Sequence, residues 1–186
     1  MIDCDKMTLL ISDDKIFYTI EGEGEYVGEP SLFFRLSMCN LTCKGFASPD
    51  SPHGCDSYIS WSVKNKMTFN DIFQYMEERK YIEKLKNNVI LKITGGEPLV
   101  QQKRLLKFIE AFIEKYDFIP RIDFETNATI MPEINLPLDR IWLMPVAGSR
   151  AEHITNAPAV AEYAKALNVK FSSRLHLLVW DMALKV

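Results

Sequence analysis

Three of the four cysteines in this 186-residue chain fall within one short window. Cys39, Cys43 and Cys55 have the spacing C-x3-C-x11-C inside the stretch "MCNLTCKGFASPDSPHGCDSY". Three thiols are an odd number for disulfides, and most structural zinc sites use four ligands. A [4Fe–4S] cluster held by three thiolates keeps one iron open, and in radical enzymes S-adenosylmethionine binds there. The spacing therefore favours a three-cysteine cluster loop.

Two other interpretations of these cysteines remain open. His53 lies two residues before Cys55, and it would complete a zinc site with the three thiols. The cysteines could also be unrelated, although so tight a grouping argues against coincidence. Cys4 stands apart in the sequence and is interpreted as an incidental thiol.

Composition points to one ordinary globular domain, with 47% hydrophobic and 25% charged residues. The net charge of −3 gives no basic field, so we expect no nucleic-acid partner. The N-terminal stretch "MIDCDKMTLL" does not resemble a secretory signal, and no apolar run approaches the ~20 residues that cross a bilayer. We therefore expect a cytoplasmic protein with no membrane partner, in which clustered cysteines stay reduced and bind metal.

Strand-like and helical stretches alternate through the middle of the chain. The strand-like stretches are residues 7–20, with a turn at Asp13-Asp14, and residues 31–38, 89–96, 121–126, 140–145 and 170–180. The helical stretches are a unit from Thr68 to Asn87-Asn88, a long segment with Leu105, Leu106, Ile109, Phe112 and Ile113 on one face, and a final helix. Thr68 with Asp71 and Ser149 with Glu152 provide capping signals, while Pro158 is expected to kink or delay the final helix. This alternation predicts an α/β fold with a mostly parallel sheet.

Two motifs follow neighbouring strands in this scheme. The cysteine loop follows the stretch 31–38, and Gly95-Gly96-Glu97-Pro98 ends the stretch 89–96. Both stretches are so apolar that we expect strands buried on both faces. Ligands of α/β folds bind at the carboxyl ends of parallel strands, so both motifs are expected at the same edge of the sheet.

Several motifs together resemble one family over nearly the whole chain. In order they are "FYTIEGEGEYVGEPSLFFRLSMCNLTC", "GCDSY", "ITGGEP", "FETNAT", "IWLMP" and "RLH". The family that they resemble is 7-carboxy-7-deazaguanine synthase, a radical S-adenosylmethionine enzyme of the queuosine and 7-deazapurine pathway. The resemblance implies a single radical S-adenosylmethionine domain over residues 1–186. Its expected fold is an incomplete TIM-like β/α barrel, shortened by the loss of one segment.

The resemblance also implies the metal and cofactor residues. Cys39, Cys43 and Cys55 would hold the cluster, and the Ser57 hydroxyl would bind Mg²⁺, a hard cation that prefers oxygen. The residues expected to bind S-adenosylmethionine are Gly54, Asp56, Gly96, Glu97, Thr126, Asn127 and Met144. Glycines let the backbone approach the methionyl end closely. An ordinary strand-end turn is the alternative for Glu125, Thr126 and Asn127.

The substrate residues that the resemblance implies come from both ends of the chain. They are Ile20, Glu21, Gly22, Glu23, Arg35, Thr94, His176 and Val186. Arg35 inside an apolar strand needs an anionic partner, which a substrate carboxylate would supply in bidentate fashion. The alternatives are a structural ion pair of Arg35 with Glu21 or Glu23, and a core position for His176.

The implied reaction is the ring contraction of 6-carboxy-5,6,7,8-tetrahydropterin to 7-carboxy-7-deazaguanine with loss of ammonia. A radical derived from S-adenosylmethionine would remove a substrate hydrogen and return it after rearrangement. A flavodoxin-like electron donor and a homodimer are also implied. The other interpretations are a small enzyme that activates a glycyl-radical partner, and a zinc-stabilised binding module.

The chain departs from the family pattern in three places. Glu21 stands where the family usually has glutamine, which replaces a donor and acceptor by an acceptor alone. Only "IMPEINLPLDR" separates "FETNAT" from "IWLMP", so a strand with an S-P-K-like cofactor contact is expected to be missing. The ending "DMALKV" does not obviously match the family, which makes Val186 a weak candidate.

Overall fold

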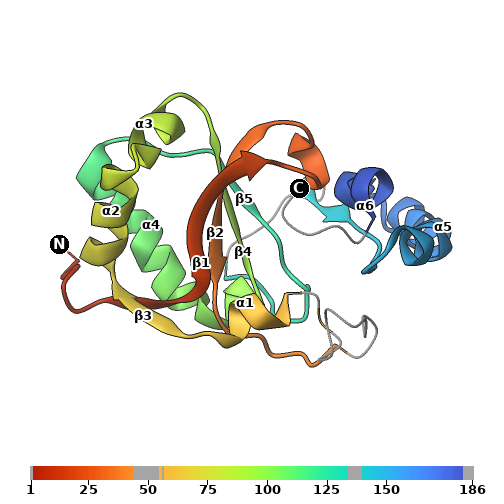
Figure 1. The fold of residues 1–186 in the computed structure, drawn as a ribbon, viewed down its shortest axis with the longest axis horizontal. Helices are drawn as coiled ribbons and strands as arrows, with labels where there is room; N and C mark the ends of the chain where they lie inside the picture. The colour runs from red at the N-terminus through yellow and green to blue at the C-terminus, as the bar shows by residue number, and fades with distance from the viewer. Residues whose placement is uncertain (1, 44–54, 56, 134–139, 182–186) are drawn as a thin grey trace. The chain divides into compact units, whose positions relative to one another are not determined.

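The computed structural model describes residues 2–43, 55, 57–133 and 140–181, and Figure 1 traces the chain. The chain divides into two compact units. The first unit comprises Met1–Thr19, Pro30–Thr42 and Ser57–Glu133, and the second comprises Ile20–Glu29, Cys43–Asp56 and Ile134–Val186. Among the described residues, no helix is both long and apolar enough to span a lipid bilayer.

A five-stranded sheet in the order β3-β1-β2-β4-β5 forms the centre of the first unit. The strands are β1 (Thr8–Ile20), β2 (Pro30–Leu36), β3 (Asn65–Thr68), β4 (Ile90–Gly95) and β5 (Ile122–Phe124). The pairs β2–β4 and β4–β5 are parallel, whereas β1 and β3 are antiparallel. The sheet is therefore mixed, and its parallel part, β2, β4 and β5, includes the two strands that the sequence motifs follow.

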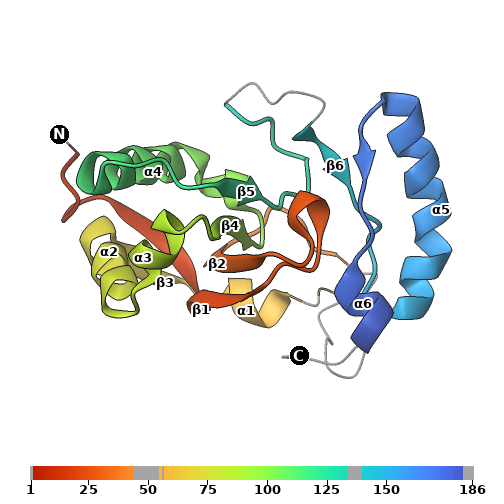
Figure 2. The same cartoon turned by 90° about the horizontal axis from the view of Figure 1, so that it is seen from above.

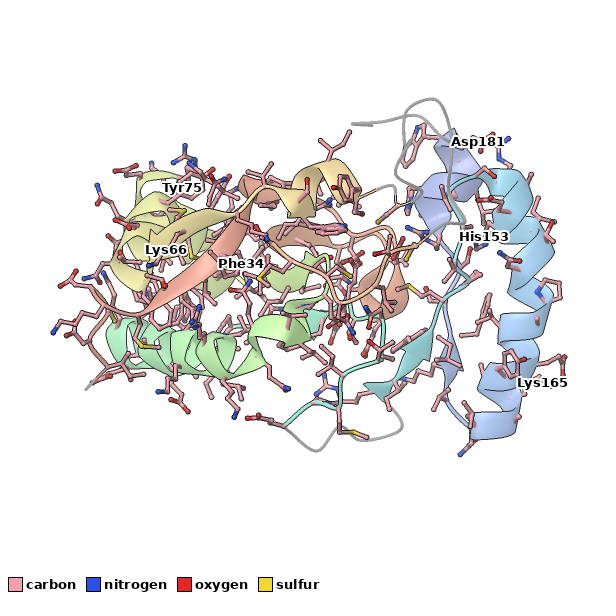
Figure 3. All side chains as sticks on the ribbon, turned by 90° about the horizontal axis from the view of Figure 1, so that it is seen from below. Phe34, Lys66, Tyr75, His153, Lys165 and Asp181 are labelled. Carbon is pink, nitrogen blue, oxygen red and sulfur yellow. The ribbon has the colours of Figure 1, made fainter. Side chains whose placement is uncertain are left out.

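The two longest helices of the first unit lie over the same face of this sheet (Figure 1). The helical elements are α1 (Tyr58–Ser62), α2 (Phe69–Glu78), α3 (Tyr81–Lys86), η2 (Pro98–Gln101) and α4 (Gln102–Tyr116). The Phe108 ring on α4 lies 5.4 Å from the ring of Phe34, 5.3 Å from Phe69 and 5.1 Å from Phe73. Figure 3 labels Phe34 within this apolar layer. All four rings are fully buried, so they form the centre of the hydrophobic core.

The first long helix begins where its capping residues predict. The Thr68 hydroxyl accepts from the Asp71 backbone N–H at 3.1 Å, and the Asp71 carboxylate accepts from the Thr68 N–H at 2.9 Å. This reciprocal capping box satisfies two N–H groups that α2 would otherwise leave exposed. The helical unit is interrupted once, at Lys80, whose φ of +57° separates α2 from α3.

Alternate residues of β2 and β4 face opposite sides of the sheet. On the helix side the strands present only apolar side chains, namely Leu32, Phe34, Leu36, Leu91 and Ile93. On the other side they present Arg35 from β2 and Lys92 and Thr94 from β4. The prediction of two deeply buried strands is confirmed for β4, whereas the alternation shows that only one face of the sheet is purely apolar.

Two short strands and two helices make up most of the described part of the second unit. They are η1 (Gly24–Tyr26), β6 (Trp142–Leu143), α5 (Arg150–Leu167), β7 (Lys170–Phe171) and α6 (Leu175–Trp180). The strands β6 and β7 are parallel. Figure 2 shows α5 running beside these two strands, with α6 following β7.

The N-terminal and C-terminal predictions each contain an error. Residues 8–20 form one strand rather than two strands around Asp13-Asp14, and Lys15, with a φ of +53°, distorts it locally. The stretch 170–180 is mostly not a strand, because β7 has two residues and α6 begins at Leu175. A short apolar run is compatible with a strand or a helix, and periodicity alone does not separate them.

The cap predicted for α5 is confirmed, since the Ser149 hydroxyl accepts from the Glu152 N–H at 3.2 Å. Pro158 does not delay the start of α5 and lies inside it. The helix is not the last one, because α6 follows it in the chain.

Candidate functional site

The carboxyl ends of β2 and β4 meet at one edge of the first unit's sheet. The Gly96 N–H donates to the Leu36 carbonyl at 3.2 Å, and the Glu97 N–H donates to the Met38 carbonyl at 2.9 Å. A Cβ atom at Gly96 would lie 2.3 Å from the Met38 oxygen and 2.9 Å from the Cys39 Cβ. Only glycine allows this approach, so the prediction that the first motif cysteine and the GGEP loop share an edge is confirmed.

The Cys39 sulfur lies at this edge and receives two N–H donors. The Leu41 backbone N–H is 3.5 Å from the Cys39 Sγ, and the Asn127 side-chain amide is 3.8 Å from it. The thiol is half-buried and lies directly after the buried end of β2. The sulfur is therefore held at the edge of the sheet by contacts from its own loop and from the loop after β5.

The Glu97 carboxylate braces the loop after β5. It is fully buried and accepts from the Thr126 hydroxyl at 2.9 Å, from the Asn127 backbone N–H at 2.6 Å and from the Leu99 N–H at 2.9 Å. This brace holds Asn127 beside Cys39, a role that the sequence did not predict. Contact of Glu97, Thr126 and Asn127 with a cofactor stays a prediction.

A buried ion-pair network occupies the face of the sheet opposite the core. The Lys92 ammonium lies 2.7 Å from the Asp123 carboxylate and 3.3 Å from the Glu125 carboxylate, and the Lys92 side chain is 2% exposed. The Thr94 hydroxyl donates to the other oxygen of Glu125 at 2.6 Å. Parallel pairing of β4 with β5 places Lys92 directly opposite Asp123. The network therefore follows from strand register.

Arg35 lies next to this network on β2, in register with Thr94 of β4. Its guanidinium carbon is 5.7 Å from the centre of the Phe17 ring. Its Nε is buried, and among the described residues it has no hydrogen-bond partner. A buried guanidinium nitrogen without an acceptor is costly, so an anion that binds here would stabilise it.

The Gly-rich segment of the second unit forms a closed turn. The Glu21 N–H donates to the Glu29 carbonyl and the Gly28 N–H to the Glu21 carbonyl, both at 2.8 Å. The buried Glu21 carboxylate accepts from the Glu23 N–H at 3.0 Å. An acceptor-only side chain suits this contact, which gives the glutamate a structural use.

This turn packs against the segment around His176. The Glu23 carboxylate is 2.6 Å from the Arg174 Nε and 3.5 Å from the His176 Nδ1. A Cβ atom at Gly22 would lie 3.2 Å from the same Nδ1, and the Leu175 N–H donates to the Gly22 carbonyl at 3.0 Å. Four of the predicted substrate residues, Glu21, Gly22, Glu23 and His176, thus lie together in the second unit.

The remaining predicted residues are less constrained. Ser57 directly precedes α1, Met144 follows β6, and Ile20 ends β1. Cys43 and Cys55 are half-buried. Gly54, Asp56, Val186 and the alternative zinc ligand His53 lie outside the described residues. Within the described part of the chain, no group of three His, Cys, Asp or Glu side chains is arranged to hold a metal.

Sequence reasoning missed three charged residues that organise these regions. Lys92 interrupts the apolar run "VILKITGG", and a lysine in a buried strand signals a paired partner. Asp123 alternates with the apolar residues of "RIDFET", which identifies its face but not its partner. Arg174 precedes "LH" in the sequence, and no local pattern there indicates its pairing with Glu23. Burial lowers the pKa of the nearby His153, and the Arg174 charge lowers it further.

The model of the family described as "4Fe-4S single cluster domain" matches residues 20–135, which include all three motif cysteines and the GGEP loop. The chain belongs to this family.

Curated relatives carry a more particular name. Proteins named 7-carboxy-7-deazaguanine synthase from Koribacter versatilis and Thermoplasma acidophilum are each 30% identical, over 132 and 129 residues. These alignments cover 71% and 69% of this chain but 50% and 52% of the relatives. The chain thus spans about half of their length. The Aquifex aeolicus protein of the same name is 30% identical over 163 residues, covering 87% of this chain and 65% of the relative.

The fold is also similar to that of a solved structure. The crystal structure of QueE from Escherichia coli matches with a TM-score of 0.60, covering 93% of this chain and 96% of that chain. Sequence identity over this match is 17%, so the similarity concerns the mixed α/β fold alone.

Proposed function

We propose that this chain carries out the reaction for which its curated relatives are named. It would contract the ring of 6-carboxy-5,6,7,8-tetrahydropterin to 7-carboxy-7-deazaguanine with release of ammonia, in queuosine or 7-deazapurine biosynthesis. The observation that carries the proposal is the close packing of Cys39 against the Gly96 backbone at the carboxyl edge of β2 and β4. A cluster ligand and a cofactor-binding loop need this juxtaposition.

The proposed architecture is a single radical S-adenosylmethionine domain built as a shortened, incomplete TIM-like β/α barrel. The parallel strands β2, β4 and β5, with helices over one face, support it as the first part of such a barrel. The short connection between β5 and β6 is consistent with the loss of one segment.

The three cysteines Cys39, Cys43 and Cys55 would hold a [4Fe–4S] cluster, and Ser57 would bind Mg²⁺. The contacts of the Cys39 sulfur with Leu41 and Asn127 support this assignment, because they hold the sulfur at the carboxyl edge of the sheet. The residues proposed to contact S-adenosylmethionine are Gly54, Asp56, Gly96, Glu97, Thr126, Asn127 and Met144. When bound, the cluster and S-adenosylmethionine would supply the radical that removes a hydrogen from the substrate.

The chain's own residues would bind and orient the pterin. Arg35 would donate to the substrate carboxylate, because its buried Nε–H has no acceptor among the described residues. Thr94 gives its hydroxyl hydrogen to Glu125, so its oxygen lone pairs remain available to a donor on the substrate. The other proposed contacts are Ile20, Glu21, Gly22, Glu23, His176 and Val186.

The proposed partners are a flavodoxin-like electron donor and a second copy of the chain. An electron donor is required because the cluster must be reduced before it can cleave S-adenosylmethionine. The homodimer would be tested by light scattering of the reconstituted protein.

Anaerobic reconstitution with iron and sulfide tests the cluster first. We expect a brown protein with a reducible cluster, and we expect Cys39→Ser to lose it. Cys4→Ser is the matched control, because Cys4 only donates a weak hydrogen bond to the Ile2 carbonyl at 3.6 Å. A colourless wild-type protein that binds one zinc ion instead would favour the zinc-stabilised module.

Turnover tests the reaction itself. The reconstituted protein would be incubated with 6-carboxytetrahydropterin, S-adenosylmethionine, Mg²⁺ and a reductant, and the products separated by chromatography. We expect 7-carboxy-7-deazaguanine without net loss of S-adenosylmethionine. Cleavage of S-adenosylmethionine without any deazaguanine would assign the chain to another radical enzyme, such as one that activates a glycyl-radical partner.

A further inference from the structure

Lys92 is one of the most deeply buried charged side chains among the described residues, yet it lies on the face of the sheet opposite the apolar core. Its ammonium contacts two carboxylates, at 2.7 Å on Asp123 and 3.3 Å on Glu125. These carboxylates are themselves only 25% and 23% exposed. Burying a lysine ammonium costs desolvation free energy, which only well-placed partners offset. The burial of Lys92 therefore needs a physical explanation.

Strand register connects Lys92 to Arg35. Arg35 pairs with Thr94, and adjacent strands are separated by about 4.8 Å. Thr94 in turn donates to Glu125 at 2.6 Å, so a carboxylate that follows β5, two strands from β2, reaches the residue paired with Arg35. Among the described residues of β2, β4, β5 and the loop that follows β5, this face carries two cations, Arg35 and Lys92, and two anions, Asp123 and Glu125, whose charges balance.

The two cations differ in their partners. Lys92 has both carboxylates within ion-pair distance, whereas the Arg35 Nε has no hydrogen-bond partner among the described residues. Without the Lys92 charge, the face would carry one excess negative charge beside Arg35. A carboxylate partly shielded from water would then be attracted to the neighbouring guanidinium, and an incoming anion would be repelled.

We propose that Lys92 is a positioning residue that holds the Asp123 and Glu125 carboxylates, so that Arg35 remains open to the carboxylate of an anionic ligand. The contact between Lys92 and Glu125 also keeps the Glu125 carboxylate in place as the acceptor from the Thr94 hydroxyl. This inference rests on the proposed function, which assigns Arg35 to the substrate carboxylate. No match reported above assigns a role to Lys92.

Ligand binding to the reconstituted protein tests the inference without turnover. Two probes are compared by fluorescence titration: 6-carboxypterin, which has the carboxylate, and pterin, which lacks it. We expect Lys92→Met to weaken 6-carboxypterin about tenfold, which equals about 1.4 kcal/mol, while pterin changes less than about twofold. Lys92→Arg keeps the charge and is expected to retain most of the discrimination between the two probes.

A second variant keeps the inference testable if Lys92→Met fails to fold. Asp123→Asn leaves Lys92 in place and adds one net positive charge, so 6-carboxypterin is expected to bind about threefold more tightly. The triple variant with Lys92→Met, Asp123→Asn and Glu125→Gln leaves Arg35 as the one charge of these four groups, so we expect it to prefer the carboxylated probe at least as strongly as the wild-type protein does.

Three results would overturn the proposal, and they differ in what else they affect. If Lys92→Met weakens both probes equally, Lys92 has a structural role only. If Asp123→Asn weakens 6-carboxypterin, the charge balance does not control the site. If the wild-type protein does not prefer 6-carboxypterin to pterin, the assignment of Arg35 in the proposed function fails together with the inference.

Discussion

The two faces of the five-stranded sheet are buried by different means. On one face, aromatic and aliphatic side chains pack beneath α2 and α4, and their burial needs no partner of any particular chemistry (Figure 3). On the other face, Lys92 is buried just as deeply, and its charge is paired with the carboxylates of Asp123 and Glu125. Both arrangements come from alternate residues of the same strands.

The difference separates stability from binding. An apolar layer gains free energy from every side chain removed from water, about 25 cal/mol per Å². A buried ion-pair network gains little net stability, because desolvation offsets the attraction between its charges. A network of this kind is therefore better explained by what it positions, which here is the edge that carries Arg35, Thr94 and Cys39.

The largest effect on stability is expected for a substitution on the apolar face. Phe108→Ala removes a ring that contacts three other buried rings, so we expect a loss of about 4 kcal/mol in the free energy of unfolding. Phe33→Ala is the control on the opposite face, where Phe33 is half-buried and stacks on Phe17 at 5.2 Å. Urea titration should show a clearly smaller loss for Phe33→Ala, and equal losses would contradict the distinction between the faces.

The next largest effect on stability is expected at the carboxyl edge of β2 and β4, where Glu97 is buried. Glu97→Ala leaves the Thr126 hydroxyl and the Asn127 and Leu99 N–H groups without their buried acceptor, for an expected loss of about 2 kcal/mol. Glu97→Gln keeps one acceptor oxygen and is expected to lose less. Faster backbone hydrogen exchange at residues 126–129 in Glu97→Ala would locate the change in this loop.

Local signals were sufficient for the elements that form the apolar face. Thr68 with Asp71 identified the start of α2 because a capping box is made by residues three apart. The Gly95-Gly96 pair identified the close approach at the edge because only glycine fits there. These features depend on neighbours in the sequence or on a hydrophobic period, and both can be read from the chain.

The polar face could not be predicted to the same extent. The partners of Lys92 lie 31 and 33 positions further along the chain, and their meeting depends on the register of β4 against β5. Similarly, the pairing of Glu23 with Arg174 spans 151 positions. The stretch "LHLLVW" fits helix and strand patterns equally, so the sequence pattern alone does not predict the helix α6 that forms there. In each case long-range packing decides the outcome.

A smaller stability effect is expected at the start of α2, which carries part of the apolar face. Thr68→Ala removes the hydroxyl that accepts from the Asp71 N–H, and loss of such a cap lowers the free energy of unfolding by about 1 kcal/mol. Thr68→Ser retains the acceptor and serves as the control. If the alanine and serine variants unfold at the same urea concentration, the capping box does not contribute to stability.

The smallest effect concerns the rim of the helical layer, where Glu77 on α2 meets α4. The Tyr116 hydroxyl donates to Glu77 at 2.7 Å and the Lys115 ammonium lies 3.1 Å away, and both lower the pKa of Glu77. Because the pKa of this carboxyl is lower in the folded state, its contribution is present above the unfolded value of about 4.3. It is lost as the pH falls through the lower folded pKa.

Glu77→Gln isolates this charge, since glutamine still accepts from the Tyr116 hydroxyl. We expect the variant to be slightly less stable than the wild-type protein at neutral pH, and the gap between their urea midpoints to close as the pH falls through the lowered pKa of the folded Glu77 carboxyl. The effect is small because the Glu77 side chain is 46% exposed, so solvent screens the ion pair. A gap that is independent of pH would mean that shape, and not charge, holds this rim of the apolar layer.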